Sequence, residues 1–230
     1  MNSPTRILPA LLALAIGSAS ASLIVTPTSI TYTGTGVEAA GLNLDDENNI
    51  INGNGLSATP TFANYTTVTH AAVSFAAPGN AWVTNDPGGP GSDYYAASGG
   101  ATIVFDVFLD QAYSLTDFVS WGYHFGSPND NDIQGVTLDY GVGSFTDGST
   151  SIVVPLAASP GAAVSTALGS TIQADRVRLT ITDNHFGTSG DGGDRVGFAE
   201  MRFVAVPEAS EAAIACIGIL GLAAHRRRKR

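Results

Sequence analysis

The sequence between Ser22 and Ala205 has very little positive charge. It contains four Arg and no Lys against 18 Asp and Glu, and the last five residues of the 230-residue chain hold half of its basic groups. This stretch is expected to repel nucleic acid and anionic membrane surfaces, because they carry negative charge as it does. The lack of Lys also excludes Schiff-base chemistry and a phosphate-binding P-loop lysine from it. Such a surface favours cations and neutral, hydroxyl-rich molecules as small partners.

Cysteine and the residue patterns of common catalytic sites are also missing. The one cysteine, Cys216, lies in an apolar stretch near the C-terminus, so the rest of the chain has no thiol for a disulfide or for thiolate chemistry. No G-x-S-x-G, HExxH or Cys/His zinc spacing occurs. A protein without catalytic activity is therefore expected. A carbohydrate-active enzyme stays open as an alternative, because glycoside hydrolysis needs only two suitably placed carboxylates.

The N-terminus has the three parts of a secretory signal peptide. Arg6 precedes an apolar run over Ile7–Ile16, and small residues follow as far as Ala21. The run is too short for a permanent membrane span. Residues 1–21 are therefore predicted to be a signal peptide that is cleaved after Ala21.

The C-terminus, residues 206–230, has the layout of a second targeting signal. A short motif comes first: Val206, Pro207, Glu208, Ala209 and Ser210. The apolar stretch Ala212–Ala224 follows, and as a helix it would rise about 20 Å, less than the roughly 30 Å hydrocarbon core of a bilayer. The chain ends on a basic cluster that is expected to stop transfer and stay in the cytoplasm: Arg226, Arg227, Arg228, Lys229 and Arg230. This order favours a single apolar transmembrane helix that holds the chain in the membrane until an enzyme removes it, although an ordinary single-span anchor has the same parts.

This tail resembles the PEP-CTERM sorting signal of Gram-negative bacteria. The matching residues are Pro207 and Glu208, followed by the short span and the terminal basic cluster. The family's second proline is replaced here by Ala209, a departure that leaves the point of cleavage open. The resemblance implies that the chain is the substrate of an exosortase-type processing enzyme. It also implies a final location at the cell surface or in the extracellular matrix.

The body, residues 22–205, is predicted to be a single all-β domain. Runs of alternating apolar residues are separated by clusters of Gly, Pro, Asn and Asp, and no amphipathic helical run or internal repeat occurs. The clearest runs are 101–109, 119–123, 136–140, 152–156 and 176–182. This alternation predicts an antiparallel β-sandwich, with Trp121 and Tyr123 in its core. A final run over 196–204 loses its alternation at Ala199–Glu200, which predicts a β-bulge.

The order of these runs resembles the discoidin or galactose-binding-like jelly roll. The similarity extends over roughly Ser29–Val204. It is carried by NIINGNGLS (49–57), Trp82, and the segments TIVFDV, LTDFVSWGY, GVTLDYG, RVRLTITDN and RVGFAEMRF. The resemblance implies loops at one end of the sandwich that bind glycans or other surface ligands. It also implies a structural calcium ion, because many members of the family hold one.

A calcium site is the first candidate site in the body. Oxygen-bearing side chains crowd one early loop: Asp45, Asp46, Glu47, Asn48, Asn52 and Asn54. Carboxylate and amide oxygens are the ligands that calcium prefers. The resemblance implies that Asn52 and Asn54 share the ion with Glu200 and the carbonyl of Ala199, although Asn52 replaces the family's usual Asp. A solvated acidic turn is the alternative, and for Asp191–Asp194, a second acidic run, a flexible polar loop is preferred.

A sugar-binding site is the second candidate. It needs an aromatic platform for the apolar face of the sugar ring and polar groups for the hydroxyls. The aromatic candidates are Trp82, Tyr94, Tyr95, Phe125 and Phe186, and the polar candidates are His124, Asp130, Asn131, Asp132, His185 and Arg195. The pairs His124–Phe125 and His185–Phe186 both follow predicted strands, so with Arg195 they are expected to form one rim. The alternative for the two histidines is a place in loops that belong to no site.

Together these patterns predict an exported surface or matrix protein whose β-sandwich binds glycan or exopolysaccharide without catalysis, with calcium as structural support. A structural or adhesive matrix component with no discrete ligand site is the alternative. The membrane is an expected partner only through the tail and only before processing.

The tail prediction can be tested by measuring the intact mass of the protein from its native envelope. We expect the mature protein to lack residues 1–21 and the apolar tail, and a variant without Arg226–Arg230 to retain the tail. A mature wild-type protein that still carries Ala212–Arg230 would instead identify a plain membrane anchor.

Overall fold

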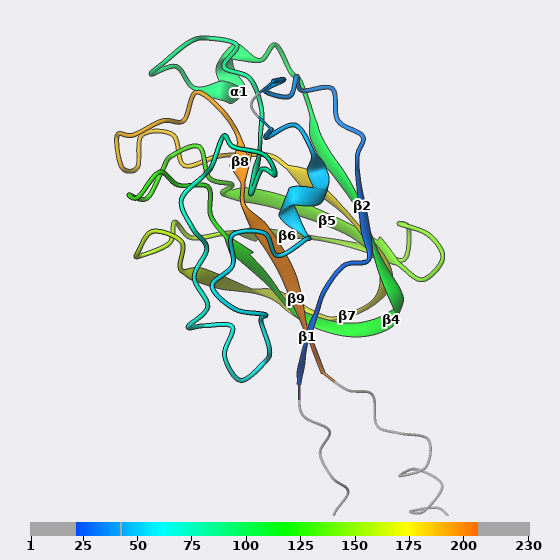
Figure 1. Ribbon diagram of the computed structural model, residues 1–230. Coiled ribbons are helices and arrows are strands. Elements are labelled where there is room, and N and C mark those ends of the chain that lie inside the picture. Colours follow the sequence, from blue (N-terminus) through cyan, green and yellow to red (C-terminus); the bar gives the residue numbers. More distant parts are fainter. Residues whose placement is uncertain (1–21, 42, 207–230) are drawn as a thin grey trace, which may run out of the picture. The chain divides into compact units, whose positions relative to one another are not determined.

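The computed structural model describes residues 22–41 and 43–206 (Figure 1). Its elements, in chain order, are β1 (Leu23–Val25), β2 (Ser29–Tyr32), the 3-10 helix η1 (Glu47–Ile50), β3 (Trp82–Val83), α1 (Tyr94–Ala97), β4 (Ile103–Trp121), β5 (Gly135–Gly141), β6 (Gly148–Val153), β7 (Ala163–Ile181), β8 (Gly197–Phe198) and β9 (Glu200–Val206). No helix within these residues has the length and apolar character needed to cross a membrane. The predicted signal peptide, apolar tail helix and basic cluster lie outside the described residues.

The strands form one large sheet and one small sheet. In the large sheet the order is β1-β9-β4-β7-β5-β6, and β2 also pairs with β4. The small sheet consists of β3 and β8. Every pairing between these strands is antiparallel, so the predicted antiparallel all-β fold is confirmed.

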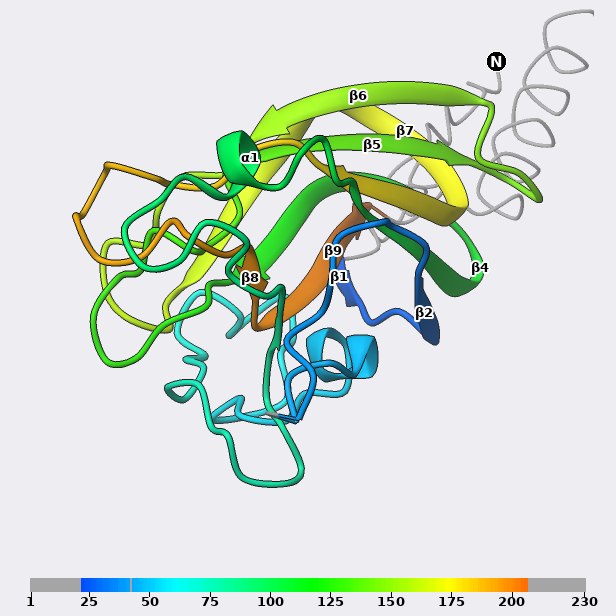
Figure 2. The ribbon, with the colours of Figure 1, turned by 90° about the horizontal axis from the view of Figure 1, so that it is seen from above.

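Two long strands, β4 and β7, run through the middle of the large sheet. Ile103 lies opposite Ile181 at one end of their ladder, and Trp121 lies opposite Ala163 at the other. The register shifts twice between residues 108 and 117. Irregularities of this kind bend a strand and increase its twist. Figure 2 shows the resulting curvature of the sheet.

The bend lets the two halves of the sheet share one hydrophobic core. Phe105 from the first half of β4 and Phe118 from the second half belong to the same buried cluster. The loop 122–134 leaves β4 at Trp121 and enters β5, where Val136 pairs with Ile181. This loop therefore connects opposite ends of the β4–β7 ladder, and both ends lie on the same side of the domain.

The alternating runs predicted from the sequence are strands, with two differences. Runs 101–109 and 119–123 belong largely to the single strand β4. The expected bulge at Ala199–Glu200 is instead a change of partner, because β8 pairs with β3 before Ala199 and β9 pairs with β4 after it. Trp121 and Tyr123 are buried, as predicted.

A substitution at Phe118 tests how much the shared core stabilises the packing of these strands. Its ring centroid lies 6.1 Å from that of Phe198 and 5.9 Å from that of Phe203, so it joins β4 to β8 and β9. We expect Phe118→Ala to lower the free energy of unfolding by about 3–5 kcal/mol, because it leaves a cavity in a packed core. Urea unfolding followed by tryptophan fluorescence measures the change. Val153→Ala, at a residue that is 69% exposed, is the control and should change little.

Candidate functional site

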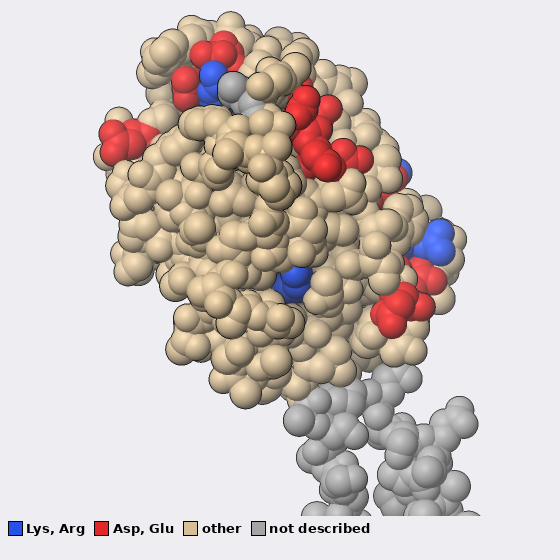
Figure 3. All heavy atoms as spheres, viewed as in Figure 1, with Lys and Arg blue, Asp and Glu red and all other residues tan. Residues whose placement is uncertain are grey.

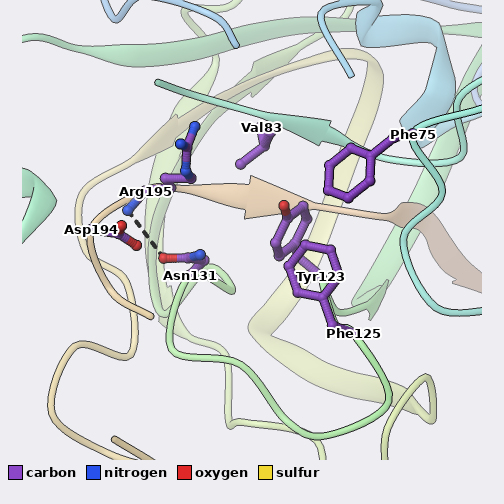
Figure 4. Close-up of a pocket in the computed structure, with 7 residues that line it drawn as sticks. All are labelled: Phe75, Val83, Tyr123, Phe125, Asn131, Asp194 and Arg195. Atoms are coloured by element: carbon purple, nitrogen blue, oxygen red, sulfur yellow. Dashed lines mark hydrogen bonds between the residues drawn. The ribbon is translucent and has the colours of Figure 1, made fainter. Parts of the chain in front are cut away.

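A pocket of about 210 Å³ opens where several loops meet. The loop 122–134 after β4 and the loop 182–196 after β7 each contribute residues, and the segment before β3 supplies another. The side chains that line the pocket are Phe75, Val83, Tyr123, Phe125, Asn131, Asp194 and Arg195 (Figure 4). These residues come from distant parts of the chain, so the pocket depends on the folded arrangement of the loops.

One side of the pocket is aromatic. The rings of Phe75 and Phe125 are stacked, with centroids 5.8 Å apart and planes at 28°. Both side chains are about half exposed, at 51% and 47%. Tyr123 is buried beneath them and meets Phe125 edge to face at 5.2 Å. Gly197 leaves room for the Tyr123 ring, because a Cβ on Gly197 would lie 2.4 Å from it. The buried tyrosine thus supports an exposed apolar platform.

The other side of the pocket is polar, and Asn131 organises it. Its side-chain oxygen accepts hydrogen bonds from the backbone N–H groups of Gly193 (2.6 Å) and Arg195 (3.0 Å). Figure 4 shows that its amide nitrogen points away from Arg195, toward the side where Tyr123 lies. The carboxylate of Asp194 lies nearby in the lining. The pocket therefore offers both an amide donor and a carboxylate acceptor beside the aromatic platform.

Arg195 lines the pocket, but its charge is already paired. Its Nη2 atom lies 3.1 Å from a carboxylate oxygen of Asp86, and its Nη1 atom donates to the carbonyl oxygen of Thr84 at 3.0 Å. With Asp194 also in the lining, the local charge is balanced or slightly negative. This arrangement does not favour an anionic ligand.

Asp130 fixes the loop 182–196 beside the pocket. Its two carboxylate oxygens accept from the backbone N–H groups of Ser189 (2.7 Å) and Gly190 (3.0 Å). Burial acts to raise the pKa of Asp130, but the hydrogen bonds from Ser189 and Gly190 hold it below its usual value. This polar network makes the pocket wall a defined structure.

The residues predicted to form a ligand rim do not all lie together. Phe125 and Arg195 line the pocket. His124 is buried, where its Nε2–H donates to the carbonyl oxygen of His70 and its Nδ1 accepts from the N–H of Gly126. Its ring therefore holds loops together behind the site.

The second predicted pair, His185–Phe186, lies outside the pocket lining. His185 is buried, and burial lowers its pKa below the usual value. Phe186 is 45% exposed and packs over Gly193, where a Cβ would lie 2.4 Å from the ring. Ligand binding by these residues stays a prediction that the pocket does not support.

Among the other aromatic candidates, Trp82 and Tyr94 are fully buried, and the hydroxyl of Tyr95 donates to the carbonyl oxygen of Ile181. None of the three lines the pocket. Phe75 was not a candidate, although an isolated phenylalanine in a loop of small residues (AAVSFAAPGN) is a usable signal for an exposed ring.

The residues of the predicted calcium site are close to one another but are already committed to protein partners. A carboxylate oxygen of Glu200 accepts from the backbone N–H of Gly53 at 2.8 Å, and the other contacts Arg202. The side-chain oxygen of Asn52 accepts from the backbone N–H of Asn54 at 2.7 Å. The side-chain amide of Asn54 donates to the carbonyl oxygen of Gly79. In this arrangement the donor set does not fit a calcium ion.

Asp132 is buried behind the pocket and carries the clearest titration expected in this region. One of its oxygens accepts from the backbone N–H groups of Ile133 (2.9 Å) and Tyr123 (3.4 Å). Burial raises the pKa of Asp132 to about 7, against the effect of these two hydrogen bonds. The native state therefore keeps a proton that the unfolded chain loses near pH 4.

This shift predicts how stability depends on pH. Because Asp132 ionises at a higher pH in the native state than in the unfolded chain, its contribution to the free energy of unfolding is fully present below about pH 4. That contribution is lost as the pH rises toward 7. In the wild-type protein we expect the free energy of unfolding to fall by about 3 kcal/mol over this pH range because of Asp132, and in Asp132→Asn we expect this fall to be absent. Urea titrations at several pH values measure the free energy of unfolding in both proteins. Burial also raises the pKa of Glu200, but Glu200 is present in the wild type and in Asp132→Asn, so its effect cancels in the comparison. Asp191→Asn, at an exposed position, is the control, and an unchanged slope in Asp132→Asn would contradict the assignment.

The sequence matches no protein-family model and no curated protein. Several solved structures are similar to it at low identity. A family 32 CBM from Clostridium perfringens NanJ, in complex with galactose, is 14% identical with a TM-score of 0.44, and the match covers 80% of this chain and 99% of that one. The C-terminal domain of a chitobiase from Bacteroides fragilis is 17% identical with a TM-score of 0.47, covering 80% and 99%. An F5/8 type C domain from the same species is 12% identical with a TM-score of 0.45, covering 80% and 97%. At TM-scores below 0.5, this similarity assigns no function to the chain.

Proposed function

We propose that the β domain is a non-catalytic module that binds a neutral glycan or exopolysaccharide in the pocket between Phe125 and Asn131. The observation that carries this proposal is the exposed, stacked pair Phe75–Phe125 beside polar groups. Adjacent exposed apolar side chains rimmed by polar groups often mark a binding site, whereas a single exposed ring does not. A sugar covers them well, because its C–H face is apolar while its rim carries hydroxyl groups.

The polar side of the pocket suits sugar hydroxyls. A hydroxyl both donates and accepts, so it can meet the amide nitrogen of Asn131 and the carboxylate of Asp194 at once. Neither group needs to change its charge to do this. The hydrogen bonds of Asn131 and Asp130 to the loop 182–196 hold the pocket in place before a ligand arrives, which lowers the entropy cost of binding.

Charge favours a neutral glycan over an acidic one. Arg195 is the one basic side chain in the lining, and Asp86 already neutralises it. On the face shown in Figure 3, acidic groups are more prominent than basic ones and broad areas carry no charge. A polyuronate would be repelled, because the body has 18 acidic residues and only four arginines.

The pocket offers little for catalysis. Of its lining residues, Asp194 alone has a carboxylate, whereas glycoside hydrolysis uses two, at about 5–10 Å from each other. Asp132, whose pKa is raised by burial, lies in the loop 122–134 but is buried behind Tyr123. Binding without reaction is therefore the simpler function for this site.

The export signals at both ends support a place for this module outside the cell. We infer that the chain is secreted, held briefly in the inner membrane by its tail, and processed near Pro207–Glu208 by an exosortase-type enzyme. A module released to the cell surface would meet extracellular polysaccharide directly. The mass measurement on the native envelope tests this part of the proposal separately from ligand binding.

Affinity electrophoresis in gels that contain neutral galactan, neutral glucan or an acidic polyuronate tests the binding proposal. We expect retardation by at least one neutral polymer, little by the polyuronate, and a loss of about tenfold in affinity for Phe125→Ala or Phe75→Ala. Phe186→Ala is the matched control, because Phe186 is equally exposed but lies outside the pocket.

The result can contradict the proposal in two ways. Equal loss in Phe186→Ala and Phe125→Ala would remove the pocket as the binding site. Mobility unchanged by every polymer would favour the alternative, a structural or adhesive matrix component without a discrete ligand site.

A further inference from the structure

A charged pair is buried on the face of β9 that points away from the main core. Glu200 and Arg202 are two residues apart, so their side chains lie on the same face of the strand. Met201 and Phe203, on the opposite face, belong to the main hydrophobic cluster. Glu200 is fully buried and Arg202 is only 3% exposed.

The pair is joined to the loop that follows η1. The Nη1 atom of Arg202 contacts Oε1 of Glu200 and also the carbonyl oxygen of Met201. The other carboxylate oxygen of Glu200 accepts from the backbone N–H of Gly53 at 2.8 Å. Gly53 lies close to the guanidinium as well, since a Cβ built on it would be 3.7 Å from Nη2 of Arg202.

A buried carboxylate needs a compensating positive charge or several strong donors, because leaving it unpaired costs several kcal/mol. The resemblance to the galactose-binding-like family implies that calcium supplies this charge at Glu200. Here the guanidinium of Arg202 lies against the same carboxylate. A calcium ion at Glu200 would have to displace a guanidinium that stays charged at any ordinary pH.

The loop itself is held by protein contacts. The carbonyl oxygen of Asn54 lies 3.0 Å from a ring nitrogen of the buried His70, and the side-chain amide of Asn54 donates to Gly79. The amide of Asn49, at the end of η1, donates to the carbonyl oxygens of Ala81 and Asn43. The position of the loop is thus fixed by hydrogen bonds within the chain.

We propose that Arg202 is a built-in cation that takes the place of calcium, fixing the loop 51–56 to β9 through Glu200. The domain therefore folds, and keeps this loop ordered, without a metal ion. The prediction of calcium at Asn52, Asn54 and Glu200 is replaced by a site in which the chain supplies its own positive charge.

The first test is the melting temperature of the wild-type protein, measured by calorimetry in excess calcium chloride and in excess chelator. We expect the same Tm in both to within about 1 °C, because a ligand that does not bind the native state does not stabilise it. A rise of about 5 °C or more in calcium would overturn the proposal, because that is the size of shift expected for a domain of this length when a site is nearly saturated. This measurement needs no variant, so it decides the question even if a variant fails to fold.

The second test asks whether the arginine charge is what the buried carboxylate needs. We expect Arg202→Met to lower Tm by about 10 °C, and the double variant Glu200→Gln/Arg202→Met to recover at least half of that loss, because it leaves no unpaired buried charge. Arg176→Met is the matched control: it breaks the partly exposed pair with Asp175 and should shift Tm by about 2 °C or less. A double variant no more stable than Arg202→Met would show that the arginine acts through packing alone, and would overturn its role as a cation.

Discussion

The bend in β4 and β7 is the constraint on which the rest of the domain depends. Nineteen-residue strands that stayed straight would place Trp121 and Ile103 at opposite ends of a long flat sheet. Because the register shifts between residues 108 and 117, the ladder folds over and the two halves cover one another's apolar faces. The two ends of the loop 122–134 then meet, as the hydrogen bond from the backbone N–H of Tyr123 to the carboxylate of Asp132 shows, and the loop 182–196 lies beside them. The pocket is a consequence of this meeting, since no single loop contains it.

The strands could be predicted from the sequence because burial on one face of a strand leaves a local trace. Val177, Leu179 and Ile181 alternate with polar residues in β7, and they are buried as that pattern indicates. The joining of two predicted runs into β4 could not be predicted in the same way. Residues 110–114 of β4 are half-buried or exposed, so the stretch where the strand bends loses the alternation that would identify it.

The site was predictable by residue type and less so by position. Phe125 and Arg195 were identified because aromatic and polar side chains after a strand tend to gather at one end of a sandwich. His124 has the same local setting, yet its ring is turned inward by a hydrogen bond to the carbonyl oxygen of His70, 54 residues away in the sequence. Phe75 reaches the pocket only because its loop folds across the molecule. Arg202 was within reach of sequence reasoning, because its spacing from Glu200 places the two on one face of a strand.

The route by which the chain leaves the domain has a mechanical consequence. Strand β9 ends near the bend, where Leu23 pairs with Ala205 and Val206 pairs with Ser114 (Figure 1). It starts near the pocket, where Glu200 pairs with Trp121. A protein tethered beyond Val206 and bound to a polymer at its pocket would be pulled along the length of β9. That strand is hydrogen-bonded to β1 on one side and to β4 on the other, with its bonds roughly perpendicular to the pull. The force would load these bonds together in shear, a geometry that resists rupture far better than opening them one at a time.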